Sequence, residues 1–301
     1  MSHSHDHDHR PDLRLGRRFA LGVGLNLAFV AVEVVWGLRA QSLALLADAG
    51  HNLGDVLGLL LSWGAWLASR AAPGGRRTYG LRRSSILAAL FNALLLLIAV
   101  GAIAWEAVAR FRQPAPVAGG VVMTVAGIGI LINATSALLF ARGRERDLNV
   151  RSAFLHLAAD AAVSLGVVLA GLAIARTGAT WIDPAVSLAV AVVILAGTWS
   201  LLRESLDLAM DAVPRGIDVE AVRGHLESLP GVDTVHDLHV WGLSTTEAAL
   251  TAHLVMPDAP CDDDFHRGLA RDLHDRFGIE HVTVQIERCG DGCAQEPEGA
   301  L

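Results

Sequence analysis

Lysine is absent from this sequence, and cysteine is nearly absent, with three residues in a chain of 301. Three cysteines, all close to one end, exclude a disulfide-rich scaffold. Cys289 and Cys293, which are separated by Gly-Asp-Gly, are instead interpreted as a reduced, metal-binding pair in a cytosolic domain. No cysteine precedes Cys261, so a metal site in the longer, N-terminal part must use nitrogen and oxygen ligands.

Charged residues are also scarce, at 18% of the sequence, and they are unevenly divided. Residues 1–203 hold 18 Arg and 11 Asp or Glu, whereas residues 204–301 hold 6 Arg and 20 Asp or Glu. This acidic C-terminal part argues against nucleic acid as a partner and in favour of cations. The sequence also lacks a nucleotide-binding glycine loop, a His-Glu-x-x-His motif and a Gly-x-Ser-x-Gly motif, so we expect no enzymatic activity.

Apolar residues are abundant: they make up 52% of the chain and raise its mean hydropathy to +0.43. Six apolar segments are each about 20 residues or longer, which is enough to cross a hydrocarbon core of about 30 Å. We therefore expect an all-α, six-helix transmembrane domain over residues 17–209 that lies in a lipid membrane. Its spans are predicted near residues 17–38, 42–69, 83–111, 117–141, 151–176 and 183–203.

The arginines predict the orientation of these spans. With a cytosolic N-terminus, 14 of the 18 Arg in residues 1–203 fall on the cytosolic side, as the positive-inside rule requires. We expect a multi-pass protein of the cell (inner or plasma) membrane with both termini in the cytosol. Residues 1–16 carry four His and lack signal-peptide character, so we expect a disordered cytosolic tail that gathers metal ions.

Two His-x-x-x-Asp pairs lie inside the apolar spans, one at His51 and Asp55 and the other at His156 and Asp160. Residues four apart share one face of a helix, and ionisable groups at membrane depth are costly unless they are functional. Because the second and fifth spans run in opposite directions, His51 should lie level with Asp160, and Asp55 with His156. Two imidazoles and two carboxylates in a tetrahedron suit Zn²⁺.

Protons bind to the same four groups, so metal binding releases protons and protonation releases the metal. Export of cytosolic Zn²⁺ in exchange for external protons is therefore the predicted function. A broader exporter of Co²⁺, Cd²⁺, Ni²⁺ or Fe²⁺ is the main alternative. A membrane metalloenzyme is a remote one, because a hydrolytic zinc site needs an open position for water and a general base. A metal-sensing protein would not need six spans.

The composition becomes that of a small soluble domain after about residue 210. Hydrophobic periodicity predicts helices near residues 217–229 and 261–277 and strands near 232–243, 247–256 and 281–288. The order α-β-β-α-β predicts a compact two-layer, ferredoxin-like or metallochaperone-like α+β domain. We expect this cytosolic metal-binding and dimerisation domain over residues 210–288, followed by a Cys-containing tail over residues 289–301.

The sequence resembles the cation diffusion facilitator family, and its zinc-transporting branch in particular. The similarity covers about residues 17–288 and is carried by four motifs. They are Ser42-Leu-Ala-Leu-Leu-Ala-Asp48-Ala-Gly-His51-Asn-Leu-Gly-Asp55, His156-Leu-Ala-Ala-Asp160, Trp181-Ile-Asp183-Pro184-Ala-Val-Ser187-Leu and Val235-His236-Asp-Leu-His239-Val-Trp241. The resemblance implies a homodimer with paired cytosolic domains, and zinc efflux driven by inward protons.

The resemblance also implies which residues bind the metal. The transport ligands fall on His51, Asp55, His156 and Asp160, with His51 favouring zinc over cadmium. Structural or regulatory zinc in the cytosolic domain would use His236, His253, His266, Glu287, Cys289 and Cys293, with His239 and His281 as weaker candidates. The chain departs from the family at Ser85, where Glu is usual. It also has no His, Asp, Glu or Cys in residues 70–82, so a metal site found there in some members is not expected.

Overall fold

The computed structural model describes most of the chain in two compact units. The helical unit comprises residues up to 60 together with residues 92–199, and the mixed unit comprises residues 61–91 together with residues from 200 onward. Some side chains are not described although their helices are; they belong to residues 13–23, 59, 62, 65, 66, 69, 136, 137, 139–141 and 148–157. The described ranges are residues 13–69, 73–113, 115–141, 148–257 and 263–288.

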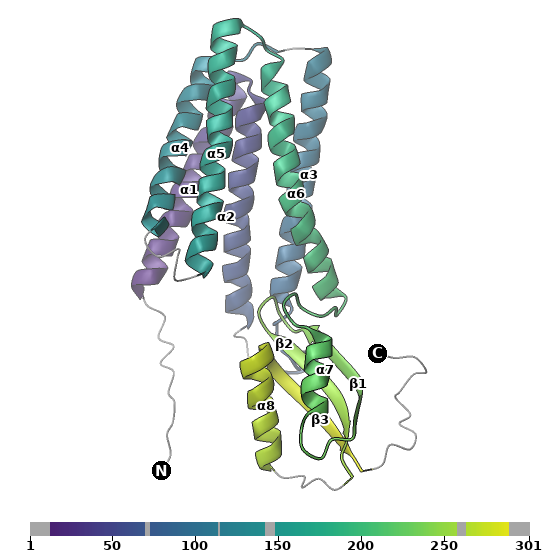
Figure 1. The fold of residues 1–301 in the computed structure, drawn as a ribbon. Helices are drawn as coiled ribbons and strands as arrows, with labels where there is room; N and C mark the ends of the chain where they lie inside the picture. The colour runs from purple at the N-terminus through teal and green to yellow at the C-terminus, as the bar shows by residue number, and fades with distance from the viewer. Residues whose placement is uncertain (1–12, 70–72, 114, 142–147, 258–262, 289–301) are drawn as a thin grey trace. The chain divides into compact units, whose positions relative to one another are not determined.

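Six long helices correspond to the six predicted spans (Figure 1). They are α1 (Leu13–Ala40), α2 (Leu43–Ser69), α3 (Ser84–Arg112), α4 (Gly119–Ala141), α5 (Leu148–Thr177) and α6 (Ile182–Ala209). By length and composition, three segments of the described residues qualify as membrane-crossing: Ser84–Arg112, Ala158–Thr177 and Ile182–Ala209. Large apolar side chains are exposed along the helices, Trp105 and Ile98 among them, as lipid contact requires.

Helices α4 and α5 lie side by side in the helical unit (Figure 1), and glycines allow their close approach. A Cβ atom built on Gly119 would lie 2.5 Å from the Gly171 carbonyl oxygen, and one on Gly171 would lie 2.9 Å from the Gly119 carbonyl oxygen. Small residues at such a crossing let backbones pack where apolar burial gives little driving force inside lipid. This contact fixes the position of α5, which carries one of the predicted His-x-x-x-Asp pairs.

The N-terminus of α2 is held by a carboxylate from the first turn of α6. Asp183 is 1% exposed, accepts the backbone N–H of Leu43 at 2.8 Å and that of Ala44 at 3.3 Å, and accepts the Ser42 hydroxyl. The guanidinium of Arg110 lies 3.8 Å from the same carboxylate. A carboxylate at a helix N-terminus satisfies free N–H groups and complements the helix dipole. The start of α2 is therefore tied to α6.

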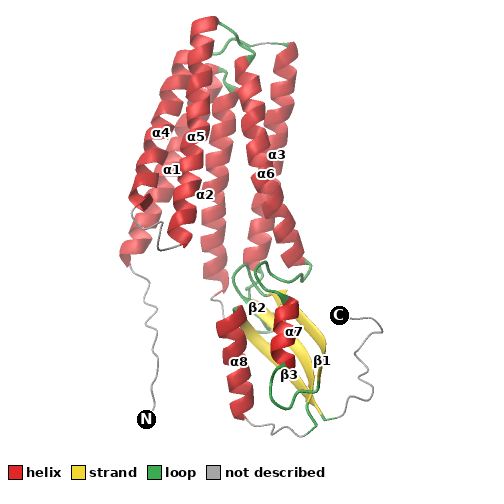
Figure 2. Cartoon of the chain, viewed as in Figure 1, coloured by secondary structure: helices red, strands yellow, loops and turns green. Residues whose placement is uncertain are grey.

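The mixed unit contains a three-stranded sheet with two helices (Figure 2). Its elements are α7 (Val219–Glu227), β1 (Thr234–Gly242), β2 (Ala248–Val255), α8 (Asp263–Phe277) and β3 (Ile279–Glu287). The sheet order is β1-β2-β3, with β1 antiparallel and β3 parallel to the central β2. This arrangement confirms the predicted α-β-β-α-β fold.

One face of the sheet forms the core of this fold. Alternate residues Leu250, Ala252 and Leu254 of β2 are buried together with Leu226 of α7 and Leu273 of α8. The other set of alternate residues therefore lies on the opposite face of the sheet. That set includes most of the predicted cytosolic ligands: His236, His239, His253, His281 and Glu287.

Candidate metal centres

The first candidate centre joins α2 to α5 in the helical unit. His51 Nε2 lies 3.1 Å from Oδ1 of Asp160 and 3.9 Å from Oδ2 of Asp55, one helical turn further along α2. Asp160 is 6% exposed, His51 21% and Asp55 34%, so the site is shielded on the α5 side and more open at Asp55. In a tetrahedral zinc site with bonds of about 2 Å, neighbouring ligand atoms are about 3.3 Å apart. These separations fit such a site.

The fourth predicted ligand, His156, lies in α5 one turn before Asp160. Its side chain is outside the described residues. Three of the four predicted membrane ligands are thus brought together by two helices far apart in sequence, and the backbone of the fourth lies one helical turn from Asp160.

The second candidate centre lies on the helix-free face of the sheet. His236 Nε2 is 3.0 Å from Oε2 of Glu287, and His253 Nδ1 is 3.2 Å from Oε1 of the same carboxylate. The strand register explains this arrangement, because His236 pairs with His253 across β1 and β2, and Glu287 pairs with Val255 across β2 and β3. The three ligand atoms lie within 4.8 Å of one another, so His236, His253 and Glu287 fit a bound metal ion.

The charge state of Glu287 suits a metal ligand. Partial burial opposes ionisation, but hydrogen bonds from Gln285 and His236 and the nearby imidazoles hold the pKa of Glu287 below its usual value. The carboxylate is therefore ionised at neutral pH and can bind a cation without first losing a proton.

Asp237 is a candidate site residue that the sequence did not single out. It has a positive φ of 49° and lies where the pairing of β1 with β2 shifts, between His236 and His239. This bulge places its Oδ2 3.5 Å from Nε2 of His253, and its Oδ1 2.9 Å from Nε2 of His239. Three polar residues within Val235-His-Asp-Leu-His239 interrupt the strict alternation of a strand, and this interruption is the available signal.

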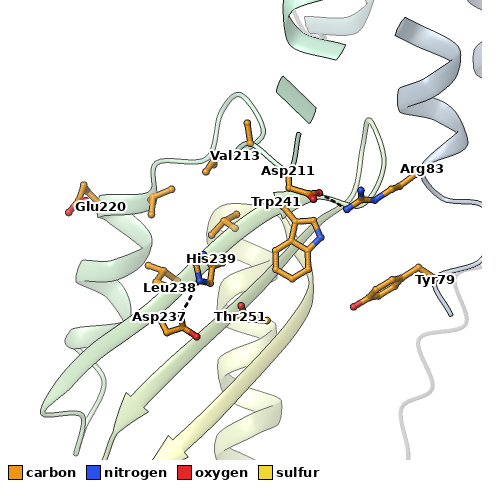
Figure 3. A pocket seen from close by; sticks show the side chains of 13 residues that line it. Tyr79, Arg83, Asp211, Val213, Glu220, Asp237, Leu238, His239, Trp241 and Thr251 are labelled. Carbon is orange, nitrogen blue, oxygen red and sulfur yellow. Dashed lines mark hydrogen bonds and ion pairs between the residues drawn. The ribbon is translucent and has the colours of Figure 1, made fainter. Parts of the chain in front are cut away.

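A pocket of about 830 Å³ opens beside this bulge (Figure 3). His239, Asp237 and Trp241 line it from β1, and Tyr79 and Arg83 line it from the segment just before α3. Arg83 forms an ion pair with Asp211, which follows α6. The pocket thus links the region around α3 and α6 to the strand that carries His236.

Ser85, where the family usually has Glu, takes part in the same connection. Its hydroxyl accepts the backbone N–H of Thr245 at 3.1 Å and donates to the carbonyl of Arg82 at 3.2 Å. Arg82 in turn lies 3.0 Å from the Glu247 carboxylate. A hydroxyl and an ion pair therefore connect the start of α3 to the turn between β1 and β2.

The remaining predicted cytosolic ligands are not gathered at this centre. His266 is exposed on α8, a helix that does not share the face of His236 and His253. His239 contacts Asp237, and His281 packs edge-on against Tyr79 with ring centroids 5.5 Å apart. Cys289 and Cys293 lie outside the described residues.

Two apolar helices bring an imidazole and carboxylates close together, and a small domain with a His-Glu group follows them. These features define a membrane transporter of metal cations. Residues 20–208 match the family described as the cation efflux transmembrane domain, and residues 214–289 match the cation efflux protein cytoplasmic domain. The chain therefore belongs to the cation efflux, or cation diffusion facilitator, family, which consists of transporters and not enzymes. This confirms the resemblance found in the sequence.

Three relatives illustrate the range of the family. The chain is 38% identical over 291 residues to the zinc transporter ZitB of Escherichia coli, which covers 95% of this chain and 93% of that protein. It is 35% identical to the metal cation efflux system protein CzcD of Cupriavidus metallidurans, covering 95% and 89% of the two chains. It is 31% identical to a cadmium, cobalt and zinc/H(+)-K(+) antiporter of Bacillus velezensis, covering 95% and 92%.

Proposed function

We propose that this protein exports Zn²⁺ from the cytosol in exchange for external protons, through a site formed by His51, Asp55, His156 and Asp160. The observation that carries the proposal is the 3.1 Å approach of His51 Nε2 to Asp160 Oδ1 across two helices of an apolar bundle. Ionisable side chains inside a membrane are costly, and where they meet across helices they commonly mark an ion or proton pathway. Both termini are proposed to face the cytosol.

The chemistry of the donor atoms favours zinc as the substrate. Imidazole nitrogen combined with carboxylate oxygen in a four-ligand site suits Zn²⁺, whereas carboxylates alone would suit Mg²⁺ or Mn²⁺. The name of the ZitB relative agrees with zinc. A second candidate is a broader exporter that also carries cadmium and cobalt, which the name of the Bacillus relative supports.

Competition between metal and protons provides the proposed coupling. His51 must lose its proton before Nε2 can bind Zn²⁺, and a protonated His51 instead pairs with Asp160. The site therefore holds either a metal ion or protons. A conformational change that exposes it alternately to the two sides of the membrane would move the two in opposite directions.

A resident zinc ion is proposed for the cytosolic domain, held by His236, His253 and Glu287. His266, Cys289 and Cys293 remain proposed as additional ligands. Metal at this centre would neutralise part of an acidic domain and favour pairing of two copies of the chain, so we propose a homodimer whose assembly responds to zinc.

The proposal is tested by proton movement in proteoliposomes that contain a pH-sensitive dye. Zinc added outside should make the lumen more alkaline, because each ion that enters is exchanged for protons that leave. Asp160→Ala should abolish the signal, whereas Glu106→Gln, a control at an exposed carboxylate of α3, should keep it. An alkaline shift of full size in Asp160→Ala would disprove the site.

A further inference from the structure

Two acidic side chains lie buried against each other, one on α1 and one on α2. Glu33 is 0% exposed and Asp48 is 1% exposed, and their carboxyl groups are within hydrogen-bonding reach of each other. Neither belongs to the metal site described above. Glu33 is 18 positions before His51 in the chain, and Asp48 is one helical turn before His51.

Each carboxyl group receives one hydrogen bond from a neutral side chain. Asn52 Nδ2 donates to Oε2 of Glu33 at 2.9 Å, and the Ser164 hydroxyl donates to Oδ2 of Asp48 at 3.0 Å. Among the described residues, no donor reaches the second oxygen of Glu33, although that atom is fully buried. A buried carboxylate oxygen without a donor is costly, whereas a protonated carboxyl oxygen becomes a donor itself.

Within the part of the chain that the structure describes, no Arg interacts with the two acids, and His51, near Asp48, is the one neighbour that can carry a positive charge. The described groups that act on Glu33 are Asp48 and Asn52. Asp48 interacts through hydrogen bonds with Glu33 and Ser164, and through charge with His51 and Asp160. The sequence of α4, which packs against α1, contains no titratable residue. Two ionised carboxylates in contact inside an apolar bundle would combine desolvation with mutual repulsion.

We infer that Glu33 and Asp48 form a proton-binding site separate from the metal site, in which one proton is shared between the two carboxyl groups. The Glu33 hydroxyl donates to the Asp48 carboxylate, while Asn52 and Ser164 hold the outer oxygens. This inference rests on the proposed function, because it assigns one of the protons exchanged for the metal to a specific pair of residues.

Electrostatics connects this acid pair to the metal site. Asp48 lies on the same side of α2 as His51, since they are three residues apart, and Ser164 lies one turn after Asp160 on α5. A divalent cation at His51, Asp55 and Asp160 favours negative charge nearby, so it drives the shared proton out to water. When the metal leaves, the pair takes up a proton again.

The test is the number of protons released when the full-length protein in nanodiscs binds zinc. Isothermal titration in buffers of different ionisation enthalpy gives this number, and the heat that disappears with Asp160→Ala belongs to the membrane site. Glu33→Gln keeps the shape and the partner Asn52 but cannot ionise, so it should release about one proton fewer per zinc ion than the wild type. Glu106→Gln should match the wild type.

The outcomes separate this inference from the proposed function. Equal proton release by Glu33→Gln and the wild type, with zinc still bound, would overturn the acid pair and leave the transport site intact. A second outcome would also overturn the inference. If zinc binding by the wild type depends on the concentration of K⁺ or Na⁺, the two acids hold a monovalent cation and not a proton. Absence of any Asp160-dependent binding in the wild type would refute the proposed function.

A measurement on the wild type keeps the test decisive if Glu33→Gln fails to fold. Infrared difference spectra of the protein with and without zinc report the C=O stretch of protonated carboxyl groups. Loss of such a band on zinc binding, with the same loss in Glu106→Gln, supports the shared proton. A spectrum without a zinc-sensitive carboxylic acid band contradicts it.

Discussion

His51 places an imidazole where the rest of the described membrane site offers carboxylates. Replacing it by Asp would leave a site richer in oxygen ligands, which discriminates less strongly in favour of Zn²⁺. We expect His51→Asp to transport cadmium better relative to zinc than the wild type. The ratio of cadmium to zinc flux in the same proteoliposomes measures this directly, and an unchanged ratio would remove His51 as the selective residue.

The carboxylate of Asp237 lies near Nε2 of His253, and Nδ1 of the same imidazole faces Glu287. We expect Asp237 to orient the ring of His253 through this contact. Residues that orient metal ligands in this way typically affect affinity by about 10- to 100-fold. We therefore predict that Asp237→Asn weakens zinc binding at the cytosolic centre by about 10-fold. Asp233→Asn, the same change at an exposed position, is the control. Equal zinc affinities of the two variants in a competition titration would exclude this role.

His274 gives the mixed unit a pH-dependent contact. Hydrogen bonding to Asp275, at 3.0 Å, and the charge of Glu280, at 3.3 Å, raise the pKa of His274 above its usual value. A raised pKa stabilises the fold below the pKa of the unfolded chain, and this contribution disappears as the pH rises through the folded-state pKa. The contact links the last turn of α8 to β3.

His274→Gln should therefore destabilise the α8–β3 region at pH 6 and have little effect at pH 8.5. Hydrogen exchange measured by mass spectrometry, as the ratio of variant to wild-type rate at each pH, separates this effect from the intrinsic pH dependence of exchange. A ratio that is the same at both pH values would show that protonated His274 does not stabilise the region.

At the scale of single residues, the sequence was informative where the same pair of metal-binding residue types recurs at helical spacing. Two His-x-x-x-Asp pairs in apolar spans predicted the approach of His51 to Asp160. Asp237 could not be placed from the sequence, because its position depends on a bulge that interrupts the alternation of β1. Glu33 showed only as a polar residue in a span, and its meeting with Asp48 depends on how α1 packs against α2.

At the scale of elements, the contact between Asp183 of α6 and the N-terminus of α2 can be tested by mutation. Asp183→Ala removes the acceptor of two backbone N–H groups and the Ser42 hydroxyl. Loss of such a helix cap costs about 1–2 kcal/mol. We predict a lower midpoint of thermal unfolding for the purified protein.

Ser187→Ala is a suitable control for this prediction. The Ser187 hydroxyl donates to the backbone carbonyl of Asp183 at 2.7 Å, so its removal leaves the carboxylate in place. The control should unfold close to the wild-type temperature. If Asp183→Ala were as stable as Ser187→Ala, the carboxylate would not be a significant cap of α2.

The limits of most elements could be predicted, because hydrophobic periodicity and length determine them locally. The largest difference is at α6, which continues to Ala209 beyond the span predicted to end at residue 203. The apolar run ends there, but Leu-Leu-Arg-Glu-Ser-Leu-Asp-Leu-Ala continues a helical pattern with charges on one side. The capping of α2 by Asp183 was not predictable, since the two residues that meet are about 140 positions apart.

At the scale of the whole molecule, the sequence divides into an apolar, Arg-rich part and an acidic part with most of the His, and the structure contains a helical unit and a mixed unit. Both units bring together imidazole and carboxylate groups. In the helical unit these groups would carry the transported ion, and in the mixed unit they would hold a resident ion that senses cytosolic zinc. The two roles require different affinities, because a transported ion must also be released.

The most direct test of the central claim is zinc flux into proteoliposomes driven by an imposed pH gradient. With the lumen more acidic than the outside, the wild type should accumulate zinc faster than with equal pH on both sides, since protons leaving the lumen drive zinc entry. Asp160→Ala should reduce this flux to the level of protein-free liposomes, while Glu106→Gln should preserve it. Undiminished, pH-driven zinc flux in Asp160→Ala would contradict a transport site formed by α2 and α5.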